Sequence, residues 1–171
     1  MINSHIIFET ERLIVRRYDF NIDTENFFLL NSDDDVMRYI RATKSKEECN
    51  VFLKKIIETY KINPLTGRWA ANEKATEKFV GSFAIIPIED SDDIQLGYAF
   101  LKENWGKGFA SELTKAGLDY YFKNTNADHI YAIAEEANIA SHKVLLKNGF
   151  VSDGIKTEEG KELLKFIFRK R

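Results

Sequence analysis

The amino-acid sequence predicts a single domain of the mixed α/β class. Its 171 residues suit one ordinary domain, and 44% of them are hydrophobic against 30% charged, as in a globular chain that buries a core. Segments with strand character and segments with helical periodicity follow one another as strand, two helices, three strands, then helix, strand, helix and two strands. The chain has no internal repeat, low-complexity tract or linker, so we expect residues 1–171 to form one domain.

The first part of the chain is expected to form one strand and then helices. Residues 12–17 are rich in β-branched side chains, which favours a strand. Residues 23–30 have the pattern of a short helix, and the acidic residues at 32–35 are typical of a helix start. A capping box at Ser45 opens a further helix, whose apolar stripe continues to residue 60.

The middle of the chain is expected to form a three-stranded meander. Its strands cover residues 68–73, 79–88 and 94–101, and polar or acidic turns separate them. Strands joined by such short turns pair antiparallel.

The last part of the chain is expected to alternate helices and strands. A helical stripe follows Gly108, and residues 129–134 form a nearly continuous apolar run, as in a strand covered on both faces. A second helix ends at Asn148-Gly149. Residues 150–155 and 163–169 have the pattern of a final strand pair.

Charge, cysteine and histidine counts exclude several classes of function. The chain carries 25 basic and 27 acidic residues, whereas a duplex-binding protein usually has a strong basic excess, so we expect no nucleic-acid partner. Its single cysteine, Cys49, excludes an intrachain disulfide and a multi-cysteine zinc site, and the three histidines form no ligand-spaced cluster. We therefore expect no metal.

Hydropathy indicates a chain that stays out of the membrane. The longest apolar stretch, at residues 83–88, is far shorter than the roughly 18 residues that a spanning helix needs. Residues 1–10 lack the basic and apolar regions of a signal peptide. We expect a cytoplasmic protein with no membrane partner.

Two closely spaced glycines mark the first candidate site. Gly106 and Gly108 follow an expected strand and open an expected helix, whose first N–H groups have no partner and carry partial positive charge. The segment suits a phosphate or pyrophosphate. Two common nucleotide motifs fail, because Lys107 is not followed by Ser or Thr and because Ser111 stands where a dinucleotide fingerprint needs glycine. A tight turn without a ligand is the alternative.

A polar pair marks the second candidate site. Asn138 and Ser141 begin the helix that follows the strand at 129–134. Asn138 suits the helix N-cap, and this structural role is the alternative to a functional one. The pair also lies at the carboxyl end of a central strand, where α/β sheets commonly bind ligands.

These segments together resemble the GNAT superfamily of N-acetyltransferases. The acetyl-CoA motif is matched by residues 97–101 (GYAFL) and 105–112 (WGKGFASE), and the downstream helix by Asn138-x-x-Ser141 with 144–150 (VLLKNGF). Residues 10–16 (TERLIVR) resemble the opening strand of the branch that acetylates ribosomal-protein N-termini, the RimJ/RimL-like branch. The similarity extends from about Phe8 to Phe168.

The resemblance implies a fold and a donor. The fold is a mostly antiparallel, twisted sheet with about four flanking helices, splayed between its fourth and fifth main strands so that the pantetheine arm of acetyl-CoA enters the gap. The backbone of Gly106, Lys107, Gly108, Phe109 and Ala110 is expected to hold the pyrophosphate, although Trp105 replaces the usual first motif residue. Expected contacts to the rest of the donor come from Phe100, Leu101, Asn138 and a lysine such as Lys143.

The resemblance also implies a reaction, which is direct attack of an amine on the thioester. Many members of the superfamily use a tyrosine seven positions after the asparagine, but Leu145 stands there, so Ser141 is our candidate acid. A backbone N–H near Phe100 or Leu101 is the candidate oxyanion donor. Cys49, far from the motif, is expected to be a packing residue.

The base and the acceptor remain open at this point. Glu135 is the first candidate base; Glu136, Glu158, Glu159 and a chain of waters are alternatives. The acceptor is a protein N-terminus or a small amine, and the protein is a monomer or a homodimer. The alternatives to an enzyme are a CoA-binding sensor without turnover and a nucleotide-binding regulatory domain.

Overall fold

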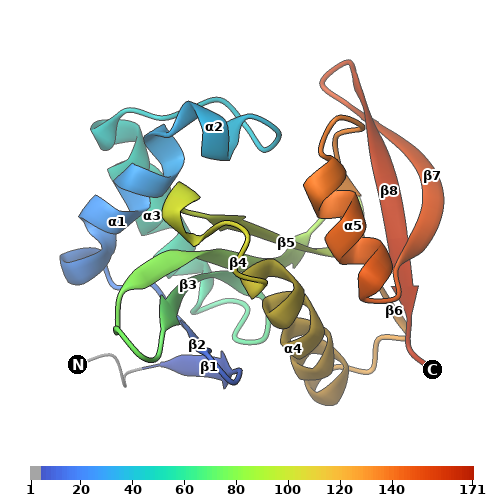
Figure 1. The fold of residues 1–171 in the computed structure, drawn as a ribbon, viewed down its shortest axis with the longest axis horizontal. Helices are drawn as coiled ribbons and strands as arrows, with labels where there is room; N and C mark the ends of the chain where they lie inside the picture. The colour runs from blue at the N-terminus through green and yellow to red at the C-terminus, as the bar shows by residue number, and fades with distance from the viewer. Residues whose placement is uncertain (1–4) are drawn as a thin grey trace.

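The computed structural model describes residues 5–171. One eight-stranded sheet runs through the molecule in the order β1-β2-β3-β4-β5-β6-β8-β7 (Figure 1). Each neighbouring pair is antiparallel except β5 and β6, which are parallel. The strands are β1 Ile6–Glu9, β2 Leu13–Arg16, β3 Gly67–Glu73, β4 Phe79–Pro87, β5 Ile94–Phe100, β6 His129–Ala134, β7 Val151–Glu158 and β8 Lys161–Arg169.

Helices flank the sheet in two groups. In Figure 1, α1, α2 and α3 gather beside the first half of the sheet, α4 packs against β1, β4 and β5 of that same half, and α5 packs against β6. Within residues 5–171 there are five α-helices and a single 3₁₀ turn, against the four or so that the sequence predicts. They are α1 Phe20–Ser32, α2 Asp34–Met37, α3 Lys46–Thr59, the 3₁₀ turn Lys102–Asn104, α4 Phe109–Asn124 and α5 Ile139–Lys147.

Side-chain caps fix where the first helices begin. The capping box at the start of α3 is confirmed, because the Ser45 side chain accepts from the Glu48 N–H while the Glu48 carboxylate accepts from the Ser45 N–H. The helix predicted at 23–30 is longer, because Asp19 caps it and α1 starts at Phe20. Asp33 caps α2, which is only four residues long.

Two strands depart from the sequence prediction at the edges of the sheet. The sequence does not predict β1, because it is a four-residue strand whose pairing with β2 and packing of Phe8 on Phe83 and Tyr120 are tertiary contacts. The last hairpin is longer than predicted and turns through Glu159 and Gly160, whose φ angles are 47° and 77°. Two consecutive positive φ angles make the tight turn that matches strand twist, so both strands extend to it.

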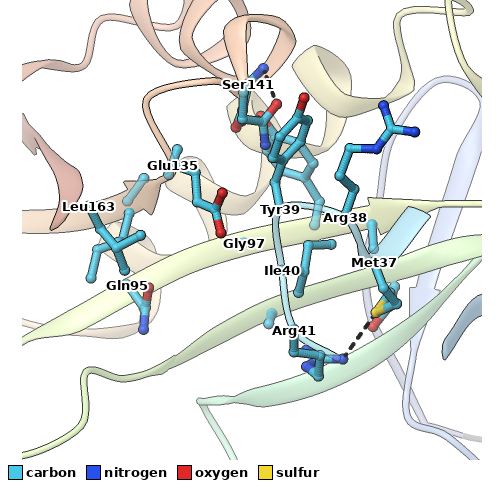
Figure 2. A pocket seen from close by; sticks show the side chains of 18 of the residues that line it. Met37, Arg38, Tyr39, Ile40, Arg41, Gln95, Gly97, Glu135, Ser141 and Leu163 are labelled. Atoms are coloured by element: carbon cyan, nitrogen blue, oxygen red, sulfur yellow. Dashed lines mark hydrogen bonds between the residues drawn. The ribbon is translucent and has the colours of Figure 1, made fainter. Parts of the chain in front are cut away.

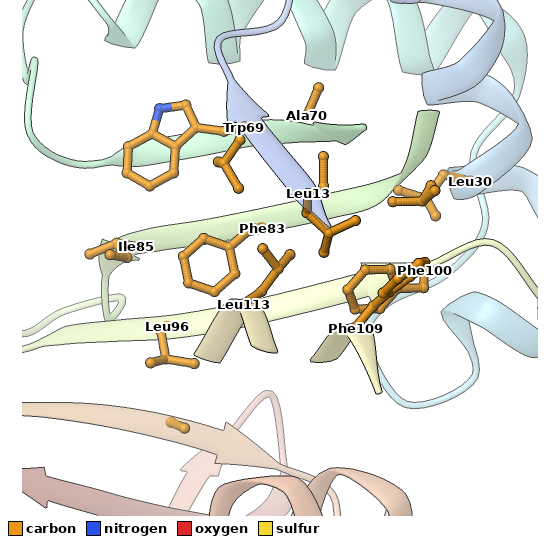
Figure 3. Close-up of a cluster of buried hydrophobic side chains, with 14 of the residues drawn as sticks. Leu13, Leu30, Trp69, Ala70, Phe83, Ile85, Leu96, Phe100, Phe109 and Leu113 are labelled. Atoms are coloured by element: carbon orange, nitrogen blue, oxygen red, sulfur yellow. The ribbon is translucent and has the colours of Figure 1, made fainter. Parts of the chain in front are cut away.

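The main core lies between the strands and α4. Figure 3 shows Leu113 and Phe109 of α4 packed against Phe83 of β4 and Phe100 of β5. The contact is close at Gly117, where an added Cβ would lie 2.3 Å from the Phe83 ring. α4 is therefore held against the sheet at a fixed depth, and this fixes the position of its N-terminus.

The sheet splays between β5 and β6. β4 and β5 share a ladder of seven residue pairs, whereas β5 and β6 share the single pair Gln95 and Tyr131. Beyond Gln95 the two strands part, so the predicted splay is confirmed. Because antiparallel hydrogen bonding alternates along a strand and the Leu101 N–H points to β4, the N–H groups of Tyr98 and Phe100 face the gap.

Neither a membrane-spanning helix nor a metal-ligand cluster is found in the part of the chain that the structure describes. No helix between residues 5 and 171 is both long enough and apolar enough to cross a bilayer. Over the same residues, no three His, Cys, Asp or Glu side chains come together as a possible metal site.

Candidate active site

A loop of free backbone N–H groups joins β5 to α4. Gly106 and Gly108 have φ angles of +72° and +81°, which L side chains rarely adopt, and Gly108 is the N-cap of α4 without any side-chain cap. Within residues 5–171, the N–H groups of residues 106–110 donate to no protein acceptor. Five unpaired donors at a helix N-terminus form a site for an anion such as pyrophosphate.

Arg12 and Glu112 connect this loop to the start of β2. The Arg12 guanidinium donates to the carbonyl of Lys107 over 2.9 Å and to the Glu112 carboxylate over 2.7 Å. Glu112 also accepts from the Thr10 hydroxyl and from the Arg12 N–H. Burial alone would raise the pKa of Glu112, but these hydrogen bonds outweigh it and hold that pKa below its usual value. The ionised carboxylate thus braces the loop from behind.

The lysines near the loop are less constrained. Lys107 is exposed, but its ammonium group donates to the Asn104 side chain over 2.9 Å. Lys143 is exposed on α5 and forms no hydrogen bond to another described residue. Both side chains are free to turn toward a ligand at the surface.

The polar pair on α5 lies at the splayed end of the sheet. Asn138 is the N-cap of α5, and its side-chain oxygen accepts from the Ser141 N–H over 3.2 Å. The Ser141 hydroxyl lies 3.0 Å from the Tyr98 hydroxyl on β5, across the gap between the strands. Burial raises the pKa of Tyr98, and the hydrogen bond with Ser141 opposes that rise in part. Tyr98 therefore stays protonated and can donate a hydrogen bond to Ser141.

A cavity of about 1060 Å³ opens beside this pair. Glu135, Asn138 and Ser141 from the β6–α5 segment line it together with Gly97 and Tyr98 of β5. Figure 2 shows the Glu135 carboxylate directed toward β5 near Gly97, while the loop from Met37 to Arg41 crosses over the strands. The Glu135 carboxylate also lies 3.5 Å from the Lys161 ammonium group.

Of the two candidate oxyanion donors, the N–H groups of Phe100 and Leu101, one is already hydrogen-bonded within the protein. The Leu101 N–H is already used, because it donates to the Val80 carbonyl over 3.0 Å. The Phe100 N–H faces the gap, so of the two it is the one left to bind a ligand. The Phe100 carbonyl accepts from the Trp105 indole N–H over 2.8 Å, which ties the start of the loop to the end of β5.

Two parts of this site were not identified from the sequence. Tyr98 lies inside the acetyl-CoA motif but has no role in the predicted site, and a strand position alone does not tell which helix its hydroxyl will meet. Arg12 and Glu112 are separated by 100 residues, so no spacing rule connects them. The only local signal was a charged residue in the first turn of an expected helix, which usually serves the helix dipole.

Comparisons with known proteins were made for the whole chain. The family model described as "Acetyltransferase (GNAT) domain" matches residues 12–151. The protein YkkB of Bacillus subtilis is 31% identical over 142 residues, which cover 82% of each chain.

Solved structures of acetyltransferases share the fold. A GNAT-family acetyltransferase from Bacillus anthracis superposes with a TM-score of 0.81 at 24% identity, covering 94% of this chain and 96% of that one. The enzyme from Salmonella typhimurium that modifies the N-terminal serine of ribosomal protein L7/L12 gives 0.81 at 16% identity, covering 98% and 100%.

A third solved structure contains the expected donor scaffold. The Vibrio cholerae spermidine N-acetyltransferase, solved with CoA and spermine, gives a TM-score of 0.75 at 22% identity, covering 92% of this chain and 95% of that one. The free N–H groups at the start of α4 and the gap beside β5 fit the same cosubstrate. This chain belongs to the GNAT family of acetyltransferases, and its acetyl donor is acetyl-CoA.

Proposed function

We propose that the protein transfers the acetyl group directly from acetyl-CoA to a primary amine held in the cavity, within a ternary complex. The observation that carries this proposal is the continuity of three features: free N–H groups at the start of α4, the opened β5–β6 gap, and a cavity at the end of that gap lined by Ser141 and Tyr98. The amine is the N-terminus of a protein or belongs to a small molecule.

The chain's backbone is suited to bind and orient the donor. The N–H groups of residues 106–110 are the proposed pyrophosphate ligands, because they lie at the start of α4 and donate to no other described residue. The N–H of Tyr98 and that of Phe100 face the gap, and there they would pair with the amides of the pantetheine arm and with the thioester oxygen. Asn138 and Lys143 are proposed as further contacts to the donor.

Ser141 is the proposed donor of a proton to the departing thiolate. Its hydroxyl lies at the gap, and a hydrogen bond from the Tyr98 hydroxyl over 3.0 Å would stabilise the Ser141 oxygen as it gives up its proton, which solvent then restores. An acid is useful here because a protonated thiol leaves more easily than a thiolate. Tyr98, with its raised pKa, keeps its own proton at neutral pH.

Glu135 is the proposed base that accepts a proton from the amine. Its carboxylate lines the cavity and points toward β5 (Figure 2). An α-amine, with a pKa of roughly 7.7–8.0, needs little help near neutral pH, whereas a lysine-type amine at about 10.4 needs much more. How much Glu135 must contribute to deprotonating the amine therefore depends on the pKa of the acceptor.

Direct transfer also agrees with the position of the only cysteine. Cys49 is 1% exposed on α3, and burial raises the pKa of its thiol. A buried thiol that stays protonated is a poor nucleophile, so a route through an acetylated cysteine is disfavoured.

The test is release of the CoA thiol from acetyl-CoA in the presence of N-terminal peptides, amino acids, polyamines or aminoglycosides. Ser141→Ala should lower kcat about 100-fold, as for the loss of a general acid, and leave acetyl-CoA affinity unchanged. Ser152→Ala, at an exposed serine of β7, is the matched control and should behave as wild type. Binding of acetyl-CoA without thiol release for any amine would indicate a sensor instead of an enzyme.

A further inference from the structure

The floor of the cavity is a row of residues across three strands. Arg68 of β3 pairs with Ala84 of β4, and Ala84 pairs with Gly97 of β5, so the three share one face of the sheet. Two of the three have little or no side chain, and a Cβ added at Gly97 would meet nothing within 4 Å. The space above the row is therefore open from β5 to the arginine.

Two guanidinium groups at this floor have no carboxylate partner. Arg68 and Arg41 both line the cavity, and within residues 5–171 neither forms an ion pair. Arg41 donates to the amide oxygen of Asn31 over 2.8 Å, a neutral acceptor, and to the sulfur of Met37. For Arg68, the structure records no side-chain hydrogen bond to a described residue.

The same protein pairs a buried arginine where its role is structural. The Arg16 guanidinium meets both oxygens of the Asp23 carboxylate at 2.8 Å, and the pair is almost fully buried. Burying a charge without such a partner is costly. Arg41 and Arg68 are only half-buried, but they differ from Arg16 in having no carboxylate partner among the described residues.

Positive side chains lie close together around the two arginines, and over residues 5–171 no carboxylate pairs with the two guanidinium groups. Arg41, Arg68 and the Lys44 ammonium all lie within 6 Å of the centre of the Phe52 ring, at 5.4, 5.8 and 5.5 Å. Burial and the neighbouring Arg68 lower the pKa of Arg41 to about 10. Burial lowers the pKa of Arg68 as well. An anion bound between the two guanidinium groups would offset the cost of burying their charges and the repulsion between them.

A buried hydroxyl near the two arginines lacks a hydrogen-bond partner among the described residues. Tyr18 is 3% exposed, and its hydroxyl has no hydrogen bond within the described residues. Burial raises the pKa of Tyr18, while the neighbouring Ser82 hydroxyl and Arg68 guanidinium act against that rise. Ser82 itself lines the cavity and donates to the Trp69 carbonyl. The unpaired Tyr18 hydroxyl thus lies near the Arg68 guanidinium, which has no carboxylate partner between residues 5 and 171.

The opposite wall of the cavity is acidic. Glu135 lines it together with Glu158 and Glu159 from the last hairpin. Lys161 is the basic residue on this wall and lies 3.5 Å from Glu135. The Ser141 hydroxyl lies on the same α5–β6 side. One wall therefore suits an amine and the other an anion.

We infer that the acceptor is an amino-carboxylate, a small molecule whose amine reacts at Ser141 and Glu135 while its carboxylate binds Arg41 and Arg68. This inference rests on the proposed function and narrows its acceptor. β3 and β5 lie about 10 Å apart, as two strand spacings require, and the arginine side chain covers part of that distance. The acceptor thus has the size of an amino acid or a short relative of one, with both ends free.

The first experiment compares acceptors that differ only at the carboxylate. Thiol release is measured for amino acids, their amides and methyl esters, and the amines that decarboxylation would give. We expect kcat/KM to be roughly 10- to 100-fold higher for the free carboxylate, as for the loss of a charge-assisted hydrogen-bonded pair. Phosphoethanolamine beside β-alanine distinguishes a phosphate from a carboxylate.

The second experiment substitutes the two arginines at the cavity floor and the asparagine that contacts one of them. Arg68→Gln and Arg41→Gln should abolish the preference for the carboxylate by raising the acceptor KM, and leave the KM for acetyl-CoA unchanged. Asn31→Asp, which is nearly isosteric, should do the same by giving Arg41 an internal carboxylate. Arg169→Gln removes an exposed arginine outside the cavity and should retain the wild-type preference.

Binding of the product separates this inference from the proposed function. Titration of an N-acetylated amino acid and of its amide, followed by NMR, needs no turnover. Binding that depends on the carboxylate and is lost in Arg68→Gln supports the inference, whether or not any amine releases thiol. Absence of thiol release with every amine would reject the proposed function alone. Turnover with equal or better use of amides, polyamines or phosphoethanolamine would overturn the inference. Arg41→Gln or Arg68→Gln proteins that are folded, as judged by thermal unfolding, and still prefer the free carboxylate would also overturn the inference.

Discussion

Tyr98 is the residue whose position most changes our view of the reaction. A tyrosine is missing from the helix position where many family members have one, because Leu145 occupies it. The Tyr98 hydroxyl comes instead from β5 and meets Ser141 from the other side of the gap. In the proposed mechanism, a strand residue and a helix residue thus act together at the departing thiolate.

Tyr98→Phe tests this pair. Removing the hydroxyl deletes one hydrogen bond of Ser141, and we expect kcat to fall about 10-fold, corresponding to about 1.4 kcal/mol, with an unchanged KM for acetyl-CoA. Because the pKa of Tyr98 is raised, its ionisation should produce no falling limb in the kcat profile below pH 10. Steady-state kinetics between pH 6 and 10 measure both. An unchanged kcat in the variant would remove Tyr98 from the mechanism.

Glu112 gives a second prediction at the scale of one residue. Its pKa is lower in the folded protein than in the unfolded chain, so its stabilisation is present above the unfolded pKa and is lost as pH falls through the folded pKa. Glu112→Gln should cost about 1 kcal/mol of the free energy of unfolding at pH 7, because the Arg12 partner is partly exposed. Urea unfolding at pH 7 and pH 3 should show a smaller difference at pH 3.

At the scale of elements, the junction between β5 and α4 forms the proposed donor site. The helix begins without a side-chain cap, its first N–H groups are free, and its depth is fixed by the contact between Gly117 and Phe83. A capping residue would satisfy the same donors that the pyrophosphate needs. The missing cap is therefore consistent with a ligand that completes the helix.

Gly108→Ala and Gly154→Ala compare two glycines of similar conformation. Their φ angles are +81° and +91°, so each substitution should cost roughly 1–2 kcal/mol of stability. Only Gly108 lies at the start of α4, and only there should acetyl-CoA affinity fall as well, since the strained loop would misalign its N–H groups. Thermal unfolding and acetyl-CoA titration measure the two effects. Equal affinities in both variants would remove the loop from donor binding.

At the scale of the whole molecule, the two halves of the sheet meet only where β5 and β6 share one pair. One hydrophobic core spans both halves, and the first half also contains a buried ion pair between β2 and α1. Arg16 binds Asp23 through both oxygens and also donates to Asn72 of β3. These bonds hold α1 against the sheet beside the cavity.

Asp23→Asn tests that anchor. The substitution leaves the Arg16 guanidinium buried without a counter-charge, so we expect a loss of about 3–5 kcal/mol in the free energy of unfolding. Urea unfolding measures it, and a paired Arg16→Met, Asp23→Leu variant serves as control, because replacing both charges should restore much of the loss. A loss below about 1 kcal/mol for Asp23→Asn would contradict a structural role for the pair.

The family and the order of most elements could be predicted from the sequence, because local periodicity, glycines and capping residues act within a few positions. The same local signals led to residues 106–108, Asn138 and Ser141 as the proposed site. The sequence did not determine β1, whose pairing with β2 is tertiary, or that the Leu101 N–H is already bonded to Val80.

Only the tertiary structure decided which distant side chains meet. The contact of Tyr98 with Ser141 spans the splay, Arg12 reaches Glu112 across 100 residues, and Arg41 and Arg68 share one cavity floor without a counter-charge. Long-range encounters follow from how the sheet twists and how α4 packs, and no spacing along the chain encodes them. The proposed amino-carboxylate acceptor rests on such encounters in the cavity and not on a motif.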